Sequence, residues 1–201
     1  VHLYSQSGGK PVYNSEIQSF VPGKSVQMEC SVGACRGELT LHGALDQGIE
    51  AGRVAARLCG YAEVSVSAPH CNPEFDTVVD PVWDCSLVGS RDSAFIDFNN
   101  DVTSADIRLA FHEGYRSVEH VKRYTTAGMG IDQGKTSSVS IIGLIAEIAG
   151  VEPEVVGTTT YRPTYCPVSL GVIAGPKSSN LIVPWRRTPI THWFLENGGH
   201  L

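Results

Sequence analysis

AFIDFNNDVTSADIRLAFHEGYRSVEHVKRYTTAGMGIDQGKTSSV, residues 94–139, is the stretch that decides the fold predicted for this chain. It predicts a strand-like opening, a first helix begun at Thr103 and a second begun at Ser117. A glycine-punctuated turn then leads into a third helix. A helix, a short turn and a helix form a compact unit, around which we expect the rest of the chain to be arranged.

Local chemistry supports these helix boundaries. Thr103 and Asp106 have the spacing of a capping box, with a negative charge in the first helical turn. Gly114 is expected to end this helix, whose buried side is predicted to contain Ile107, Leu109, Ala110 and Phe111. Ser117 can cap the second helix, whose apolar face is predicted to hold Val118, Val121 and Tyr124.

The third helix is predicted over the apolar residues 141–148, with Gly150 at its end. The preceding Gly134-Lys135-Thr136-Ser137 invites comparison with a P-loop, but that motif requires a glycine where Met129 stands. We therefore expect no ATP site. A lysine and two hydroxyl groups at a helix N-terminus remain favourable for one anionic group, and simple capping of the helix is the alternative.

Residues 1–60 are predicted to begin with a strand, a Gly-Gly turn and a further extended segment, followed by a strand over Lys24–Cys30. In that strand Val26, Met28 and Cys30 would share one face. A helix with apolar positions from Leu41 to Leu58 follows. A strand, a small-residue turn and a helix are typical of the edge that meets a dinucleotide. Because G-x-G-x-x-G is absent, an ordinary packing turn is the alternative.

Residues 61–93 contain few periodic apolar positions, and they are predicted to form a linker. His70, Cys71, Asp84 and Cys85 could be imagined as a zinc site, but their spacing fits no usual metal pattern, so a structural loop is favoured.

Residues 157–171, GTTTYRPTYCPVSLG, are predicted to be extended because proline breaks any helix there. Arg162 could pair with a phosphate or a partner carboxylate, or it could brace the extended segment. Near the C-terminus, exposure of Trp185, Trp193 and Phe194 would leave an apolar patch suited to a further domain.

Composition limits the classes of function. The chain has 201 residues, 42% hydrophobic and 18% charged, with a net charge of −6. These values are typical of a folded protein and give no basic stripe for nucleic acid.

No apolar run approaches the ~20 residues of a membrane-spanning helix. The six cysteines lack C-x-x-C spacing, so we expect reduced thiols and a cytoplasmic location. The absence of an initiator Met suggests a piece of a larger polypeptide.

A family resemblance rests on residues 94–137 and continues through GTTTYRPTYCPV and RRTPITHW. These long ungapped runs resemble the alpha subunit of heterotetrameric sarcosine oxidase. The resemblance implies four parts: the end of an NAD-binding domain (1–60), a linker (61–93), a helical domain (94–170) and the start of an aminomethyltransferase-like domain (171–201). The expected fold class is α+β, with a strand-turn-helix edge followed by a small helical domain.

The helical unit also resembles, more distantly, the bacterioferritin-associated ferredoxin type of two-iron, two-sulfur domain. In that type a C-x-C before the first helix and a C-x4-C after the second supply four thiolates. The corresponding residues here are Asp97, Asn99, Asp132 and Ser137. Because such clusters need thiolate ligands, we expect the cluster-binding shape without the cluster, reused as a packing or flavin-contact surface.

The resemblance implies oxidative demethylation of sarcosine, with FAD in the beta subunit, FMN at the junction of alpha and beta, and tetrahydrofolate in a domain beyond this chain. Beta, gamma and delta subunits are the implied partners, and this chain itself is expected to be non-catalytic. Residues carried over as NAD contacts are Gly33, Ala34, Leu39 and Leu41. The FMN candidates are Lys135, Thr136, Ser137 and Arg162. The alternatives are a pure subunit-assembly module, or part of a related proline, hydroxyproline or opine dehydrogenase.

Overall fold

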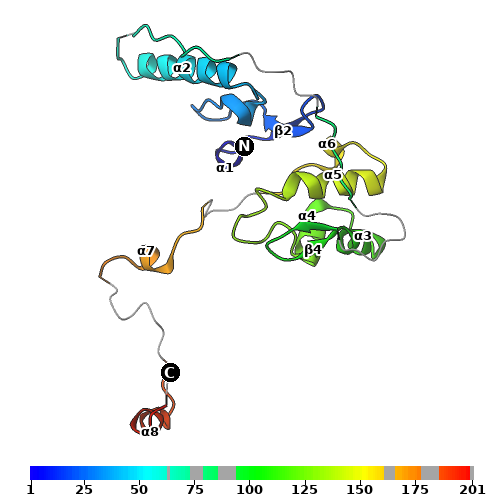
Figure 1. The fold of residues 1–201 in the computed structure, drawn as a ribbon, viewed down its shortest axis with the longest axis vertical. Helices are drawn as coiled ribbons and strands as arrows, with labels where there is room; N and C mark the ends of the chain where they lie inside the picture. Colours follow the sequence, from blue (N-terminus) through cyan, green and yellow to red (C-terminus); the bar gives the residue numbers. More distant parts are fainter. Residues whose placement is uncertain (63, 73–78, 86–93, 161–165, 178–185, 200–201) are drawn as a thin grey trace. The chain divides into compact units, whose positions relative to one another are not determined.

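The computed structural model describes residues 1–62, 64–72, 79–85, 94–160, 166–177 and 186–199. The chain divides into two units, Val1–Tyr165 and Cys166–Leu201. The described elements are helices and two separate two-stranded antiparallel sheets, so the structure is a mixed helix and strand fold (Figure 1).

Helix α5 (Ser138–Ala149) forms the centre of the larger unit. Its run of apolar residues is buried almost completely, and α3 (Ser104–His112) and α6 (Pro153–Val156) pack against it. Gly150 ends the helix in the left-handed conformation, with φ of +66°, a backbone state that glycine adopts without steric cost. The predicted third helix and its end are confirmed. Its fully or nearly buried residues are Ile141, Ile142, Leu144, Ile145 and Ala146.

The predicted capping box is present. Strands β3 (Phe95–Asp97) and β4 (Val102–Thr103) pair antiparallel and lead directly into α3. The Thr103 hydroxyl accepts the Asp106 N–H at 3.3 Å, and the Asp106 carboxylate accepts the Thr103 N–H at 2.9 Å. This exchange satisfies two N–H groups that the helix start would otherwise leave unpaired.

The buried faces of the first two predicted helices are narrower than expected. In α3, Ile107 and Ala110 are buried but Leu109 is about half exposed. Helix α4 (Val118–Thr125) begins after Ser117 as predicted, but the Ser117 hydroxyl makes no capping hydrogen bond. The helix start was therefore predicted correctly, and the capping role of that side chain was wrong.

The first residues form a short helix, α1 (His2–Gln6), and the strand predicted there is wrong. Tyr4 explains the difference, because its buried ring brings its hydroxyl to the carbonyls of Lys10 (3.2 Å) and Lys24 (2.9 Å). Strands β1 (Pro11–Asn14) and β2 (Ser19–Pro22) form a hairpin beyond it.

The strand predicted over Lys24–Cys30 is also wrong. The segment is irregular, Met28 is 90% exposed, and no strand of the described chain pairs with it. A 3₁₀ turn, η1 (Gly33–Arg36), and helix α2 (Leu41–Leu58) follow. The predicted helix is confirmed, and the 3₁₀ turn stands at the predicted small-residue turn before it. None of the residues in α2 is buried.

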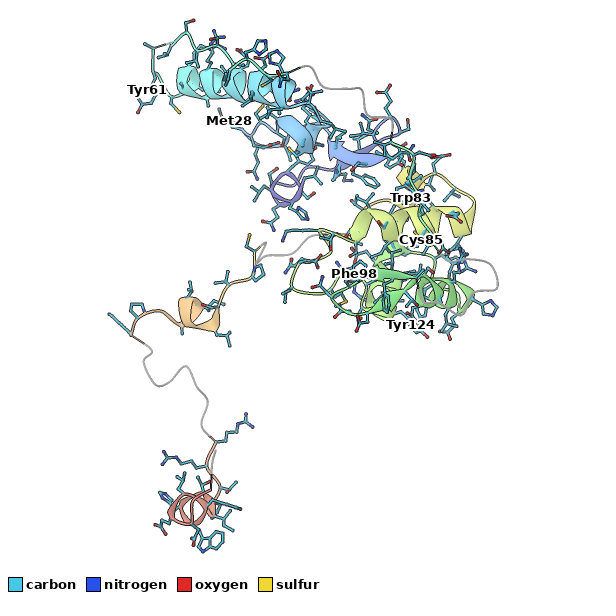
Figure 2. The ribbon with its side chains drawn as sticks, viewed as in Figure 1. Met28, Tyr61, Trp83, Cys85, Phe98 and Tyr124 are labelled. Atoms are coloured by element: carbon cyan, nitrogen blue, oxygen red, sulfur yellow. The ribbon has the colours of Figure 1, made fainter. Side chains whose placement is uncertain are left out.

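Part of the predicted linker packs on the helical unit (Figure 2). The Trp83 ring lies against Gly143 of α5 so closely that a methyl group added to Gly143 would come within 2.2 Å of it. The neighbouring Asp84 carboxylate accepts both Nε (3.2 Å) and Nη2 (2.5 Å) of Arg108 from α3. Residues 83–84 therefore fasten the linker to two helices.

The smaller unit contains α7 (Leu170–Ala174) and α8 (Thr191–Glu196). Helix α7 begins inside the segment predicted to be extended. Trp193 and Phe194 are exposed as predicted, whereas Trp185 lies outside the described residues. In the described ranges, no helix combines the length and apolar character needed to cross a membrane.

We predict that Gly143→Ala destabilises the chain by about 1–3 kcal/mol, since the added methyl group overpacks the Trp83 contact. Urea unfolding followed by circular dichroism measures the change. Gly48→Ala is the matched control, because Gly48 is a helical glycine with open space around it, and it should be neutral or stabilising. Equal destabilisation by both substitutions would contradict the contact.

Candidate functional site

The glycine-rich loop between α4 and α5 is anchored by the buried carboxylate of Asp97, which is 1% exposed. One carboxylate oxygen accepts the Gly128 N–H at 2.6 Å, and the other accepts the Asn99 N–H at 2.9 Å. A buried carboxylate is stable only when such donors compensate its lost hydration. Asp97 therefore joins the β3–β4 turn to the start of the loop.

A second carboxylate, Asp132, closes the loop from within. It accepts the Gly134 N–H at 3.0 Å and both the N–H (3.2 Å) and the hydroxyl (2.6 Å) of Thr136. Partial burial raises the pKa of Asp132, but these hydrogen bonds and the Lys135 charge outweigh it, so the pKa lies below its ordinary value. The carboxylate thus stays charged and holds the turn.

Close backbone approach makes the loop compact. Gly134 has φ of +74°, and a methyl group there would meet the Ser138 hydroxyl at 2.4 Å and the Gly128 Cα at 3.1 Å. A methyl group on Gly130 would meet the Asn99 side chain at 2.4 Å. Gln133 also has a left-handed backbone, with φ of +53°, an uncommon state for a residue with a side chain.

The four residues that we expected to stand in place of ferredoxin cysteines all lie at this loop. Asp97 and Asn99 approach it from the β3–β4 turn, while Asp132 and Ser137 belong to it. The Ser137 hydroxyl is buried and has no hydrogen-bond partner within the described part of the chain.

The FMN candidates differ in accessibility. Lys135 is exposed and lines a cavity of about 210 Å³ together with residues of α1, β2 and α5. Thr136 is exposed, but its hydroxyl donates to Asp132, and Ser137 is buried. Arg162 lies outside the described residues.

The NAD candidates surround the turn before α2. Gly33 is buried, has φ of +70°, and donates its N–H to the Gln47 side chain at 2.9 Å. Ala34, Leu39 and Leu41 are exposed. Glu38 lies beside them at the N-terminus of α2, where its carboxylate accepts the N–H (2.9 Å) and hydroxyl (2.6 Å) of Thr40. The hydroxyl bond and then the N–H bond lower the pKa of Glu38, so a negative charge already occupies this helix end.

A cavity of about 280 Å³ between α4 and the glycine-rich loop was not predicted from the sequence. Its charged lining comes from α4, where Glu119 and Arg123 are one helical turn apart and form an ion pair at 3.0 Å. The (i, i+4) spacing of opposite charges was the available signal, but it is also common on solvated helix surfaces. The lining residues are Glu119, Lys122, Arg123, Gly128, Met129, Gln133 and Thr160.

The imagined zinc site is not assembled. Asp84 is committed to Arg108, and among the residues that the structure describes no group of three or more His, Cys, Asp and Glu side chains could hold a metal ion. All six cysteines are free thiols.

Comparison with known proteins gives matches along nearly the whole chain. The chain is 40% identical over 98% of its length to the sarcosine oxidase alpha subunit of Rhizobium meliloti (strain 1021), covering 20% of that protein. It is 38% identical over 98% of its length to the protein of the same name from Corynebacterium sp. (strain P-1), covering 21%. An opine oxidase subunit of Rhizobium meliloti (strain 1021) is 32% identical over 37% of the chain, which covers 16% of that protein.

A solved structure, L-proline dehydrogenase from P. horikoshii, shares the fold with a TM-score of 0.62 at 15% identity, over 86% of this chain and 36% of that one. Residues 91–176 match the family described as the sarcosine oxidase A3 domain. The chain spans about one fifth of the length of the sarcosine oxidase subunits that it matches. The chain is therefore similar to one stretch of the sarcosine oxidase alpha subunit, and the similarity includes the A3 domain at residues 91–176.

Proposed function

We propose that the chain is part of the alpha subunit of a multi-subunit sarcosine oxidase. The observation that carries the proposal is 40% identity over 98% of the chain to a protein of that name. In the complex, FAD and FMN supply the redox chemistry from sarcosine to oxygen, and tetrahydrofolate accepts the one-carbon unit. Amine oxidation belongs to the beta subunit, with gamma and delta as further partners, and this chain's own residues hold cofactors and subunits in place.

A proline, hydroxyproline or opine dehydrogenase is the second candidate. The opine oxidase match and the L-proline dehydrogenase fold favour it. The opine oxidase match covers 37% of the chain, against 98% for the sarcosine oxidase subunits. The extent of the match therefore favours sarcosine. A pure assembly module is the remaining candidate, in which the helical unit docks subunits without touching a cofactor.

Oxygen uptake by the assembled complex tests the substrate. We expect the complete alpha subunit, coexpressed with its partner subunits, to consume oxygen with sarcosine and to show at least about tenfold lower kcat/KM with proline, hydroxyproline or an opine. One missing or misplaced substrate contact is enough for that ratio. Preference for proline or an opine would instead support the second candidate.

For the helical unit, we propose a ferredoxin-type scaffold that holds its shape without an iron–sulfur cluster. Asp97 and Asp132 together accept N–H groups from Asn99, Gly128, Gly134 and Thr136. These bonds can fix the loop in the way that metal–thiolate bonds would. Carboxylate, amide and hydroxyl groups are poor ligands for a cluster that requires thiolates.

We predict that Asp97→Asn costs about 1.5–3 kcal/mol of unfolding free energy, because an amide loses the charge and turns one donor toward an N–H group. Urea unfolding of the chain measures it. Asp101→Asn is the control, since Asp101 is exposed with φ of +52°, a conformation that asparagine tolerates.

Iron in the purified chain, with a sulfur-to-iron absorption band, would overturn the cluster-free scaffold.

For FMN, the proposal places the phosphate near Lys135, Thr136 and Ser137 at the start of α5, with Arg162 as a further contact. Lys135 is the strongest candidate of the four because its side chain is exposed. The Thr136 hydroxyl would first have to leave Asp132, and that of Ser137 is buried without a partner in the described chain.

Lys135→Ala in the assembled enzyme should weaken FMN retention about tenfold, the effect of losing one charge-assisted hydrogen bond. Flavin released on dialysis, separated from FAD by chromatography, measures retention. Lys10→Ala is the control, since Lys10 is exposed and lies outside the cavity that Lys135 lines. Unchanged FMN content and turnover in Lys135→Ala would contradict this contact.

For NAD, we propose contact with Gly33, Ala34, Leu39 and Leu41. Leu39 and Leu41 are exposed apolar side chains that can cover a ring or a ribose. The Glu38 carboxylate at the start of α2 makes that helix end unfavourable for a pyrophosphate, but it can accept a hydrogen bond from a ribose hydroxyl. The proposed contact is therefore with the sugar and ring parts of the cofactor.

A further inference from the structure

The cavity beside α4 has a positively charged lining. Lys122 has no carboxylate partner within the described chain, and Arg123 is paired with Glu119. Arg123 makes both of its contacts with Glu119 through Nη1, to the carboxylate at 3.0 Å and to the carbonyl at 2.9 Å. Within the described chain, its Nη2 and Nε take no part in these contacts and can donate to a ligand, in the fork geometry that suits a phosphate.

Among the described residues of this lining, Glu119 is the one with an acidic side chain, and both its carboxylate oxygens have partners. One accepts the Thr160 N–H at 2.7 Å, and the other faces Arg123. Two cations and one such carboxylate leave a net charge of +1 in a chain whose total is −6. Attraction is strengthened in a concave site, because water screens the charges less there.

The loop side of the cavity contributes a polar amide. Gln133 lines it, and its backbone is in the left-handed conformation noted above. Sparsely populated backbone states of this kind concentrate at ligand sites. Met129, about half exposed, gives the cavity one apolar edge.

The volume limits the occupant. About 280 Å³ is slightly below the ~300 Å³ at which pockets for drug-sized ligands begin. The space is large enough for a phosphate group with a few attached carbon atoms.

We propose that the cavity formed by Lys122, Arg123, Gln133 and Thr160 binds the phosphate group of a nucleotide-type ligand. This site is separate from the start of α5, because Lys135, Thr136 and Ser137 do not line the cavity. It is independent of the FMN contact proposed for Lys135.

Phosphate titrations of the isotopically labelled chain, followed by nuclear magnetic resonance, test the site. Inorganic phosphate, FMN, NAD and riboflavin are the probes, and the amide signals of Gly128, Gln133 and Thr160 report on the cavity. We expect saturable shifts with the three phosphate-bearing probes and none with riboflavin. Tighter binding of FMN or of NAD than of free phosphate identifies which nucleotide supplies the group.

Lys122→Gln should raise the half-saturating concentration about tenfold, whereas Lys122→Arg, which keeps the charge, should stay within about twofold of the unmodified chain. Lys10→Gln, an exposed lysine outside the cavity, is the matched control and should change nothing. Lys10 is exposed and Lys122 is half-buried on the surface of α4, and each substitution keeps a long polar side chain, so the fold is expected to persist.

Three results would overturn the proposal: no shift at the cavity amides, a half-saturation unaffected by Lys122→Gln, or equal binding of riboflavin. Shifts confined to residues 135–138 would also overturn it, while supporting the separate FMN contact. Cavity shifts in a Lys135→Ala chain would support this site even if FMN retention proved independent of Lys135.

Discussion

The carboxylate of Asp97 lies buried between the β3–β4 turn and the glycine-rich loop, and it accepts one N–H group from each. Burial of a carboxyl group to 1% exposure is tolerated because these donors replace water. The bond to Gly128 fixes where the loop begins, and the loop in turn positions Gln133 and the start of α5. The cavity beside α4 and the cofactor candidates at α5 therefore both depend on one buried side chain.

Helix α5 provides the support on which this geometry rests. Its apolar run is covered by α3 on one side, and the Trp83 ring covers Gly143. A glycine in the middle of a helix costs about 0.5–1 kcal/mol relative to alanine. Here the missing side chain makes room for an indole ring. The segment predicted as a linker is thus part of the packing of the helical unit, and the Asp84–Arg108 pair secures it.

Local sequence signals predicted the elements that local interactions determine. The Thr103–Asp106 capping box, the Gly150 end of α5 and the helix over Leu41–Leu58 all follow from residues within one or two turns of each other. Contacts between residues far apart in the sequence could not be predicted from these local signals. Alternation predicted a strand over Lys24–Cys30, but a strand also needs a pairing partner. The Lys24 carbonyl instead accepts a hydrogen bond from the Tyr4 hydroxyl, whose side chain is buried.

At the candidate sites, too, the sequence predicted local features and did not predict contacts between distant residues. Glycine, lysine and hydroxyl residues before a helix indicated anion binding, but the pattern did not reveal that Asp132 caps the Gly134–Thr136 turn or that Glu38 lies at the start of α2. A carboxylate at a helix N-terminus is stabilised by the helix dipole, and it also lowers the attraction of that end for phosphate. On α4, by contrast, the Glu119 carboxylate pairs with Arg123 and accepts a backbone N–H group. The Lys122 charge is not balanced by a carboxylate in the described chain. The balance of charge, which depends on tertiary neighbours, favours phosphate binding at the side of a helix over binding at its end.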